Sequence, residues 1–175
     1  IQALKAVWHR GAIDADGKTG DGAGIHIEIP PDFFIEKIEA TGHKHDDSEV
    51  CVGMLFLPRN NYSAQEECRS IVESELTKSN FNIYGWRQVP VNPSVLGETA
   101  DSNRPEITQV LFKHNVKEEK GKKLEIKLYE ARRKIEKKIL EANLNDFYIC
   151  SFSSKSIIYK GMFLAEALSD FYLDL

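Results

Sequence analysis

The feature that most constrains the fold of this chain is an unbroken apolar run from Val50 to Leu57. The run is far too short to cross a bilayer, which takes about 20 residues in a helix. Its length is typical of a strand that is buried on both faces of a sheet. We therefore predict a buried strand here, and a chain of 175 residues that is 42% hydrophobic can supply a core around it.

Further strands are predicted on both sides of this run. Ile25, Ile27 and Ile29 alternate with polar residues, which is the period of two that a half-buried strand shows. The other predicted strands are residues 82–91, 107–112, 147–152 and 157–160. The last two flank the short polar segment Ser153-Ser154-Lys155, which predicts a β-hairpin.

Helical patterns occupy the segments between these strands. Ser63, with Glu66 three residues later, has the spacing of a capping box and predicts the start of a helix. The charged stretch from Lys113 to Lys138 contains one apolar stripe at helical spacing. Shorter helices are predicted over the first residues, ending near Gly11, and after Pro31. The stripe consists of Leu124, Leu128, Ala131, Ile135 and Ile139.

The order of these elements predicts the fold class. Several strands follow one another without a helix between them, which favours a mixed or antiparallel sheet with helices on its faces. The polar segment 41–49 is expected to be an exposed loop. The sequence contains no internal repeat, no low-complexity segment and no convincing boundary between two domains. We therefore predict a single α+β domain.

Charge and cysteine content exclude several classes of protein. A net charge of −4 and a pI near 5.8 argue against a nucleic-acid partner, because such binders normally present a basic face. No secretory signal or membrane-spanning segment is found, so we expect a cytoplasmic protein without a membrane partner. Cys51, Cys68 and Cys150 are odd in number and widely spaced among apolar residues, as expected of reduced thiols in a core.

The histidines predict no metal site and no catalytic base. His43 and His45 come nearest to a ligand pair, but they lie in a charged stretch that a solvated loop explains equally well. No metal is therefore expected. His9 and His114 are expected to be ordinary histidines at the surface or at helix ends.

The most unusual local sequence is a loop rich in aspartate and glycine, residues 14–24. Gly17-Lys18-Thr19 reproduces the end of a phosphate-binding loop, but that motif needs glycine where Ala12 stands and a strand where a helix is predicted. The loop's aspartates would also repel a triphosphate. Two interpretations remain open: a glycine-rich connection with capping aspartates, or a backbone that approaches another group closely. The residues alone lead no further than a soluble mixed α/β domain.

Three stretches, in the correct order, carry a resemblance that covers essentially the whole chain. The first runs from residue 3 to residue 25 and includes His9-Arg10-Gly11. The second is Tyr84-Gly85-Trp86-Arg87, continued through residues 88–109, and the third is residues 145–162, ending in Tyr159-Lys160-Gly161-Met162. Together they resemble the N-terminal amidotransferase domain of glutamate synthase large (alpha) subunits, with the bacterial NADPH-dependent type as the close match. The His-Arg-Gly motif is shared more loosely by other class II amidotransferases.

The resemblance implies an N-terminal-nucleophile hydrolase fold, in which two stacked antiparallel sheets lie between layers of helices (α/β/β/α). Residues 1–175 would form part of one glutamine amidotransferase type 2 domain, lacking its N-terminal nucleophile strand and its C-terminal part. Ile1 is not an initiator Met and opens directly into a predicted helix, so we expect the chain to come from a longer one.

The resemblance also implies a reaction. An N-terminal cysteine attacks the side-chain amide of L-glutamine, with its own α-amino group as base and an Asn-Gly pair holding the oxyanion. The ammonia passes to synthase domains of the same polypeptide, where 2-oxoglutarate is aminated and reduced to glutamate. FMN and an iron–sulfur cluster belong to those domains, and a small (beta) subunit would bring FAD and NADPH.

This chain departs from the family pattern at the nucleophile. The family's cysteine lies on a strand before the first helix, and Cys51, Cys68 and Cys150 are internal and carry no free α-amino group. The family's oxyanion pair follows the segment that matches residues 171–175, where this chain ends. We therefore expect this fragment alone to be inactive, with no catalytic residue of its own.

What remains is the supporting part of the site. Arg10 would lie near the nucleophile or form a structural ion pair, and both roles stay open. Trp86 and Arg87 are expected to pack rather than to act in catalysis. A non-catalytic module that keeps the fold as a binding or interaction surface is the alternative function. The residues expected to surround the site are Arg10, Gly11, Asp21, Gly22 and Gly24.

Overall fold

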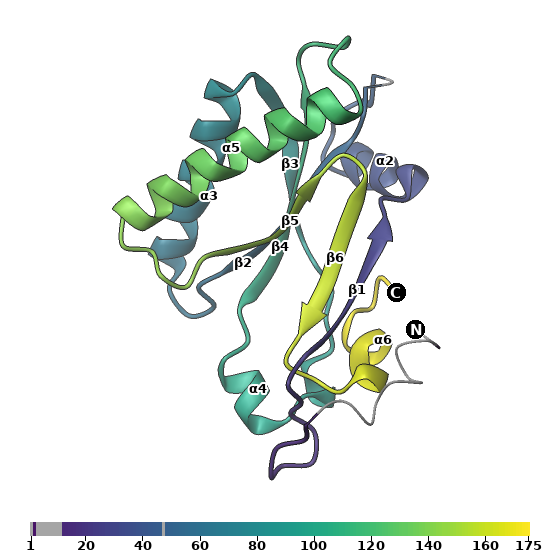
Figure 1. Cartoon of the computed structure of the whole chain (residues 1–175), viewed down its shortest axis with the longest axis vertical. Coiled ribbons are helices and arrows are strands. Elements are labelled where there is room, and N and C mark those ends of the chain that lie inside the picture. The colour runs from purple at the N-terminus through teal and green to yellow at the C-terminus, as the bar shows by residue number, and fades with distance from the viewer. Residues whose placement is uncertain (1, 3–11, 47) are drawn as a thin grey trace. The chain divides into compact units, whose positions relative to one another are not determined.

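The structure is a computed structural model that describes residues 2, 12–46 and 48–175 (Figure 1). Apart from Gln2, the helix predicted over the first residues, with His9, Arg10 and Gly11, lies outside the described residues. The strands are β1 (Ala23–Glu28), β2 (Cys51–Leu57), β3 (Phe81–Gln88), β4 (Glu106–His114), β5 (Tyr148–Ser153) and β6 (Ser156–Gly161). The α-helices are α2 (Pro31–Ala40), α3 (Tyr62–Lys78), α4 (Glu98–Ser102), α5 (Lys122–Glu141) and α6 (Leu168–Phe171), with 3₁₀ turns at Pro93–Val95 and Ala165–Ala167.

The apolar run forms an interior strand, as predicted. Among the described residues, the larger sheet has the order β3-β4-β2-β5, and β2 pairs antiparallel with both β4 and β5. Gly53 lies opposite Val110 on one side and Phe152 on the other. A Cβ atom on Gly53 would come within 2.7 Å of the Val110 side chain and 2.8 Å of the Phe152 ring, so these two side chains fill the space above the glycine.

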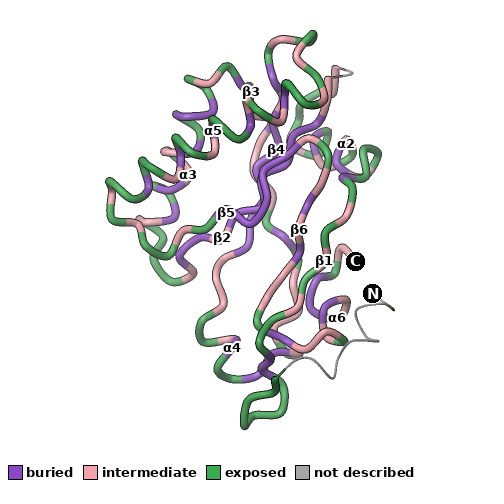
Figure 2. The backbone as a smooth tube through the Cα atoms, in the orientation of Figure 1, coloured by how far each residue is buried: buried purple, intermediate pink, exposed green. Residues whose placement is uncertain are grey.

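Helices α3 and α5 cover one face of this sheet (Figure 1). The stripe predicted for α5 is confirmed, because Leu124, Leu128, Ala131, Ile135 and Ile139 are all buried. Burying a leucine or isoleucine side chain contributes about 1.5–3 kcal/mol, so this stripe is a large part of what holds α5 to the sheet. Figure 2 shows the consequence: β2 and β4 are buried along most of their length, while the outer faces of the two helices are exposed.

The start of α3 differs from the prediction. The residue that caps the helix is Asn61, whose side-chain oxygen accepts a hydrogen bond from the Ala64 backbone N–H at 3.0 Å. Ser63 lies inside the first turn, so the capping box predicted from Ser63 and Glu66 is wrong. An asparagine at this position satisfies one of the amides that a helix leaves without a partner at its N-terminus.

The second sheet, β1 with β6, corrects another prediction. The alternation of Ile25 and Ile27 with exposed neighbours is confirmed in β1. However, β6 pairs with β1 in an antiparallel arrangement, whereas β5 belongs to the larger sheet, so the predicted β5–β6 hairpin is wrong. The Lys155 carbonyl accepts a hydrogen bond from the Ile29 N–H at 2.9 Å, which directs the chain away from β5.

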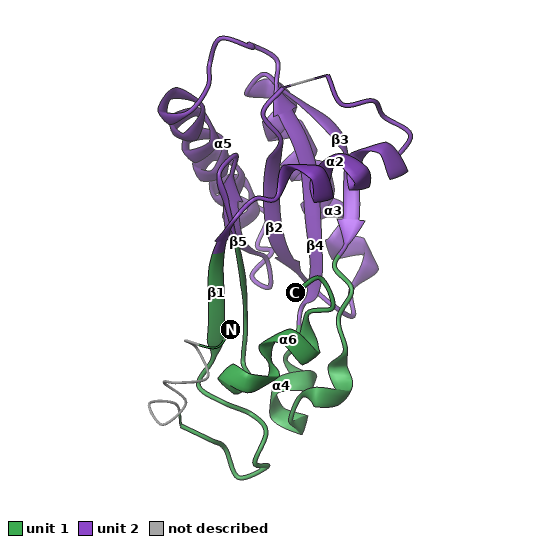
Figure 3. Cartoon of the chain, turned by 90° about the vertical axis from the view of Figure 1, so that its right-hand side faces the viewer, with its two compact units in different colours: residues 1–26, 89–104, 158–175 green, residues 27–88, 105–157 purple. Residues whose placement is uncertain are grey.

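The chain divides into two compact units, and each is built from separate stretches of sequence (Figure 3). Unit 1 contains residues 1–26, 89–104 and 158–175, and unit 2 contains residues 27–88 and 105–157. Because the units interleave along the chain, no single boundary in the sequence separates them. The structure confirms an α+β fold with two antiparallel sheets. Within its described part, no helix has both the length and the apolar character needed to cross a membrane.

Candidate functional site

The glycine-rich loop is organised around the carboxylate of Asp16. Asp16 Oδ1 accepts hydrogen bonds from the backbone N–H groups of Lys18 at 2.9 Å and Thr19 at 2.7 Å. Asp16 Oδ2 accepts one from Thr19 Oγ1 at 2.5 Å. These bonds, those from Thr19 above all, lower the pKa of Asp16 to about 2, because each favours the ionised carboxylate.

Asp21 closes the other end of the same loop. Its Oδ2 accepts a hydrogen bond from the Ala12 N–H at 3.0 Å, and its own N–H donates to the Ala12 carbonyl at 3.3 Å. Ile13 and Gly20 form an antiparallel bridge between these contacts. The aspartates therefore cap backbone amides, as the first interpretation of the loop predicted. Amides bonded in this way are not presented to a phosphate group.

Gly22 and Gly24 lie where a side chain would not fit. Gly22 has a φ of 122°, a conformation that residues with a Cβ rarely adopt. A Cβ on Gly24 would come within 2.8 Å of the Lys160 Cβ and 3.0 Å of the Tyr159 carbonyl oxygen. The backbone of this segment therefore approaches β6 closely, so the second interpretation of the loop also holds here.

Unit 1 brings together segments from all three stretches that carry the family resemblance. Val91 bridges Tyr172, and the Asn92 N–H donates to the Phe171 carbonyl at 2.8 Å. Tyr172 Oη donates to the Lys160 carbonyl at 2.7 Å. The rings of Tyr159, Phe163, Phe171 and Tyr172 pack against one another in this unit.

Trp86 and Arg87 lie in unit 2, each held by contacts that fit a packing role. Trp86 Nε1 donates to Glu73 Oε1 at 2.7 Å, and the Trp86 ring packs against the hydrophobic core. Arg87 Nη1 donates to the Oε1 of Gln109 at 2.9 Å, and its guanidinium lies 5.3 Å from the centre of the Phe33 ring. The structure thus places both side chains among structural partners of their own unit.

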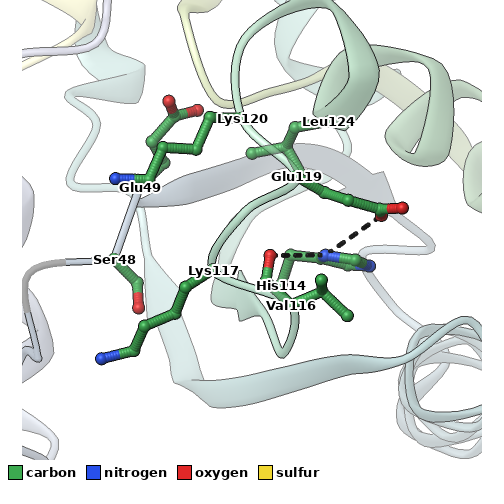
Figure 4. A pocket seen from close by; sticks show the side chains of 8 residues that line it. All are labelled: Ser48, Glu49, His114, Val116, Lys117, Glu119, Lys120 and Leu124. Carbon is green, nitrogen blue, oxygen red and sulfur yellow. Dashed lines mark hydrogen bonds and ion pairs between the residues drawn. The ribbon is translucent and has the colours of Figure 1, made fainter.

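A small pocket in unit 2 is a poor alternative site. Figure 4 shows it beside His114, whose Nδ1 lies 3.3 Å from the Val116 carbonyl oxygen and 3.5 Å from Glu119 Oε2. Its volume of about 30 Å³ has room for about one water molecule and none for an amino-acid substrate. His114 is buried at the end of β4 against the Phe81 ring, so the prediction of a surface or helix-end histidine is wrong.

The loop at 41–49 carries contacts that the sequence did not indicate. His43 Nδ1 lies 3.0 Å from Thr41 Oγ1, and His45 Nε2 lies 2.8 Å from the Ser48 carbonyl oxygen. Asp46 forms an ion pair with Lys113 at 2.5 Å. Part of this loop is half-buried rather than exposed, because Asp46 has a cationic partner on β4. Among the described residues, no cluster of histidine, cysteine and carboxylate side chains has the arrangement of a metal site.

Sequence reasoning also missed the contact between Asp16 and Gly97. A Cβ on Gly97 would overlap both Asp16 Oδ2 and Thr19 Oγ1, so the glycine leaves room for the carboxylate. The only signal in the sequence is that Gly97 follows Leu96 within the second stretch of the resemblance. Nothing in that spacing indicates an aspartate far earlier in the chain.

Comparisons with known proteins point to one family. The model of the family described as class-II glutamine amidotransferases matches residues 1–175. The glutamate synthase (NADPH) large chain of Azospirillum brasilense is 55% identical over 175 residues, which are 100% of this chain and 12% of that protein. The ferredoxin-dependent glutamate synthase of Cyanidium caldarium is 41% identical over 179 residues, 100% of this chain and 11% of that protein. The chain therefore spans only a small part of the relatives that it matches.

Proposed function

Because the chain belongs to the class-II glutamine amidotransferase family, we propose that it forms part of the glutaminase domain of a glutamate synthase large chain. In this role it contributes to hydrolysis of L-glutamine to glutamate and ammonia, and the ammonia is used for reductive amination of 2-oxoglutarate. The observation that carries the proposal is 55% identity over the full length of the chain to an NADPH-dependent large chain.

The fold expected of this function is the four-layer N-terminal-nucleophile arrangement. Two antiparallel sheets and the helical layer of α3 and α5 support it. We propose that residues 1–175 are part of one such domain, and that further segments of a longer polypeptide complete its layers.

The site proposed here is formed around the glycine-rich loop of unit 1. Asp21, Gly22 and Gly24 would line it, because this backbone is held in a fixed turn and lies against β6. Arg10 and Gly11, which lie shortly before the loop in the sequence, would stand beside the nucleophile. The convergence of the three resembling stretches in unit 1 supports this location.

We propose that none of the three cysteines in this chain is the nucleophile. Cys51, Cys68 and Cys150 are all buried, and none of them forms a disulfide. Burial raises the pKa of Cys68 to about 11, and it raises that of Cys51 still further, with the nearby Glu125 carboxylate adding to the effect. A catalytic thiol needs the opposite, a lowered pKa and access to substrate. Residues 1–175 by themselves are therefore expected to hydrolyse no glutamine.

The cofactors of the proposed parent enzyme would bind elsewhere in it. Iron–sulfur clusters take four cysteine ligands as a rule, and the three buried cysteines of this chain do not fit such a cluster. FMN and the cluster would belong to synthase domains of the same cytoplasmic polypeptide. A small subunit carrying FAD would deliver electrons from NADPH.

The first experiment is the intact mass and N-terminal sequence of the natural protein, together with its glutaminase activity. A chain with a mass well above 19.9 kDa that begins with cysteine and releases ammonia from glutamine would support the proposal. A natural protein of that larger mass that binds partners but releases no ammonia from glutamine would instead indicate a non-catalytic module.

The role of Arg10 is tested in the same complete protein. Replacing Arg10 with Ala is expected to lower the rate of glutamine hydrolysis by about tenfold to a hundredfold, the loss that a small misplacement of reacting groups causes. Arg10→Lys keeps the positive charge but removes the planar guanidinium with its paired N–H donors, so it shows whether the charge alone is sufficient. Unchanged hydrolysis in Arg10→Ala would mean that this arginine only forms a structural ion pair.

A further inference from the structure

We propose that Asp16 is a positioning residue for glutamine hydrolysis, because its carboxylate packs the glycine-rich loop against Gly97. The inference rests on the proposed function, in which this loop lines the glutaminase site. It adds a residue that acts through the loop backbone and not by contact with substrate.

The first step is that Asp16 fixes the shape of its own loop. Its two oxygens accept from Lys18 N–H, Thr19 N–H and Thr19 Oγ1, at distances between 2.5 and 2.9 Å. Thr19 is buried, so its hydroxyl cannot exchange this partner for bulk water. A carboxylate that accepts several such bonds holds the turn more tightly than a neutral acceptor would.

The second step is that the same carboxylate reaches a segment far away in the sequence. Gly97 lies against Asp16 Oδ2 and Thr19 Oγ1, and the backbone of Thr99 in α4 makes a small contribution to the lowered pKa of Asp16. Gly97 has φ −75° and ψ 162°, an extended conformation that any residue can adopt. The glycine is therefore required for space at the carboxylate and not for backbone freedom.

The third step connects this contact to the site. Only Gly20 separates Thr19 from Asp21, and Gly20 is itself confined by its bridge to Ile13 and by the Phe163 backbone, which a Cβ on Gly20 would approach to 3.0 Å. Because Gly20 has little room to absorb a shift of Thr19, such a shift would displace Asp21 and the glycines that follow. Small displacements of groups that position a substrate cost large factors in rate.

The test compares two variants of Thr19 in the complete enzyme, with glutamine hydrolysis as the readout. Thr19→Val keeps the size of the side chain but removes the hydroxyl that donates to Asp16, and it should lower kcat/KM for glutamine at least about tenfold. Thr19→Ser keeps the hydroxyl and should restore most of the activity. The loss in Thr19→Val should appear in kcat more than in KM, since the loop positions reacting groups.

Two further variants test the carboxylate itself. Asp16→Asn replaces one acceptor oxygen by an N–H₂ group that faces other donors. Gly97→Ala places a methyl group against the carboxylate. Both variants should lose activity as Thr19→Val does. Asp32→Asn is the matched control, because Asp32 is an exposed aspartate of α2 outside the loop, and it should leave hydrolysis unchanged. Thermal unfolding of every variant accompanies the kinetics.

The outcomes separate this inference from the proposed function. Activity lost in Thr19→Val and Asp16→Asn but kept in Thr19→Ser, with similar unfolding temperatures, supports the positioning role. Wild-type activity in Thr19→Val, or an equal loss in Thr19→Ser, overturns it while the proposed function stands. A wild-type enzyme that releases no ammonia from glutamine overturns both.

Discussion

The Glu125 carboxylate accepts two hydrogen bonds from Ser154, one from its backbone N–H at 2.8 Å and one from its hydroxyl at 2.9 Å. Ser153 Oγ lies 3.0 Å from both oxygens of the same carboxylate. Glu125 belongs to the first turn of α5, Ser153 is the last residue of β5, and Ser154 lies in the connection to β6. This one side chain therefore fastens the start of the longest helix to the point where the chain leaves the larger sheet.

Replacing Glu125 with Ala should lower the free energy of unfolding by about 1–3 kcal/mol, because hydrogen bonds to a charged group are lost and half-buried donors remain. Glu125→Gln keeps one acceptor and should cost less. Glu130→Ala on the same helix is the control, since Glu130 pairs only with Lys127 at the exposed surface and should change stability by less than about 0.5 kcal/mol. Denaturant unfolding measures all three, and equal losses in Glu125→Ala and Glu130→Ala would contradict the role given to Glu125.

The cap of α3 gives a second prediction. Asn61→Ala should destabilise the protein by about 1 kcal/mol, because the Ala64 N–H loses its side-chain acceptor. Ser63→Ala should have almost no effect, since Ser63 already lies within the helix. Unfolding curves of the two variants decide between Asn61 and Ser63 as the capping residue. A larger loss in Ser63→Ala would favour the cap that the sequence pattern predicted.

Local patterns predicted the elements whose burial is regular along the chain. The stripe from Leu124 to Ile139 has the period of a helix packed on one core. The run from Val50 to Leu57 is unbroken, because its strand is buried on both faces. Either pattern is readable without knowing the partner. The same holds for Ile25 and Ile27 in β1, where exposed and half-buried positions alternate.

Features that depend on distant partners could not be predicted in this way. The segment Ser153-Ser154-Lys155 has the composition of a hairpin turn, but its side chains bind Glu125 and its strands join different sheets. The contact of Asp16 with Gly97 is equally distant in sequence. The proposed location of the site rests on the family resemblance, because composition alone describes a glycine-rich loop and not what it faces.

The ion pair of Asp46 with Lys113 predicts a dependence of stability on pH. The hydrogen bond from Lys113 and a second one from Ser48 Oγ, at 2.6 Å, lower the pKa of Asp46 well below the ordinary value for aspartate. The folded state therefore binds this proton less readily than the unfolded state. Stabilisation by Asp46 is complete above the unfolded pKa of about 4 and is lost as pH falls from there toward the folded pKa.

Asp46→Asn should consequently lower stability at pH 7, and the difference from wild type should shrink as the pH is taken below about 4. Glu118→Gln is the control, because Glu118 is exposed, and it should leave the loss of stability at acidic pH unchanged. Unfolding free energies measured from pH 7 to pH 3 test both variants. A difference that stays constant over this range would mean that the ion pair contributes nothing to the pH dependence.

The cysteines give the last prediction. Cys51 and Cys68 have no exposed surface and Cys150 has 5%, so a thiol reagent reaches them only when the structure opens. With a pKa of about 11, roughly one Cys68 in a thousand would be a thiolate at pH 8, whereas an ordinary cysteine would be about one quarter ionised. In the native protein at pH 8 all three should therefore react slowly with an aromatic disulfide, and in denaturant all three should react at once. Peptide mapping after a timed exposure reads each cysteine separately, and the denatured sample is the control. Rapid native labelling of Cys68 would show that α3 opens away from the sheet far more often than its buried contacts imply.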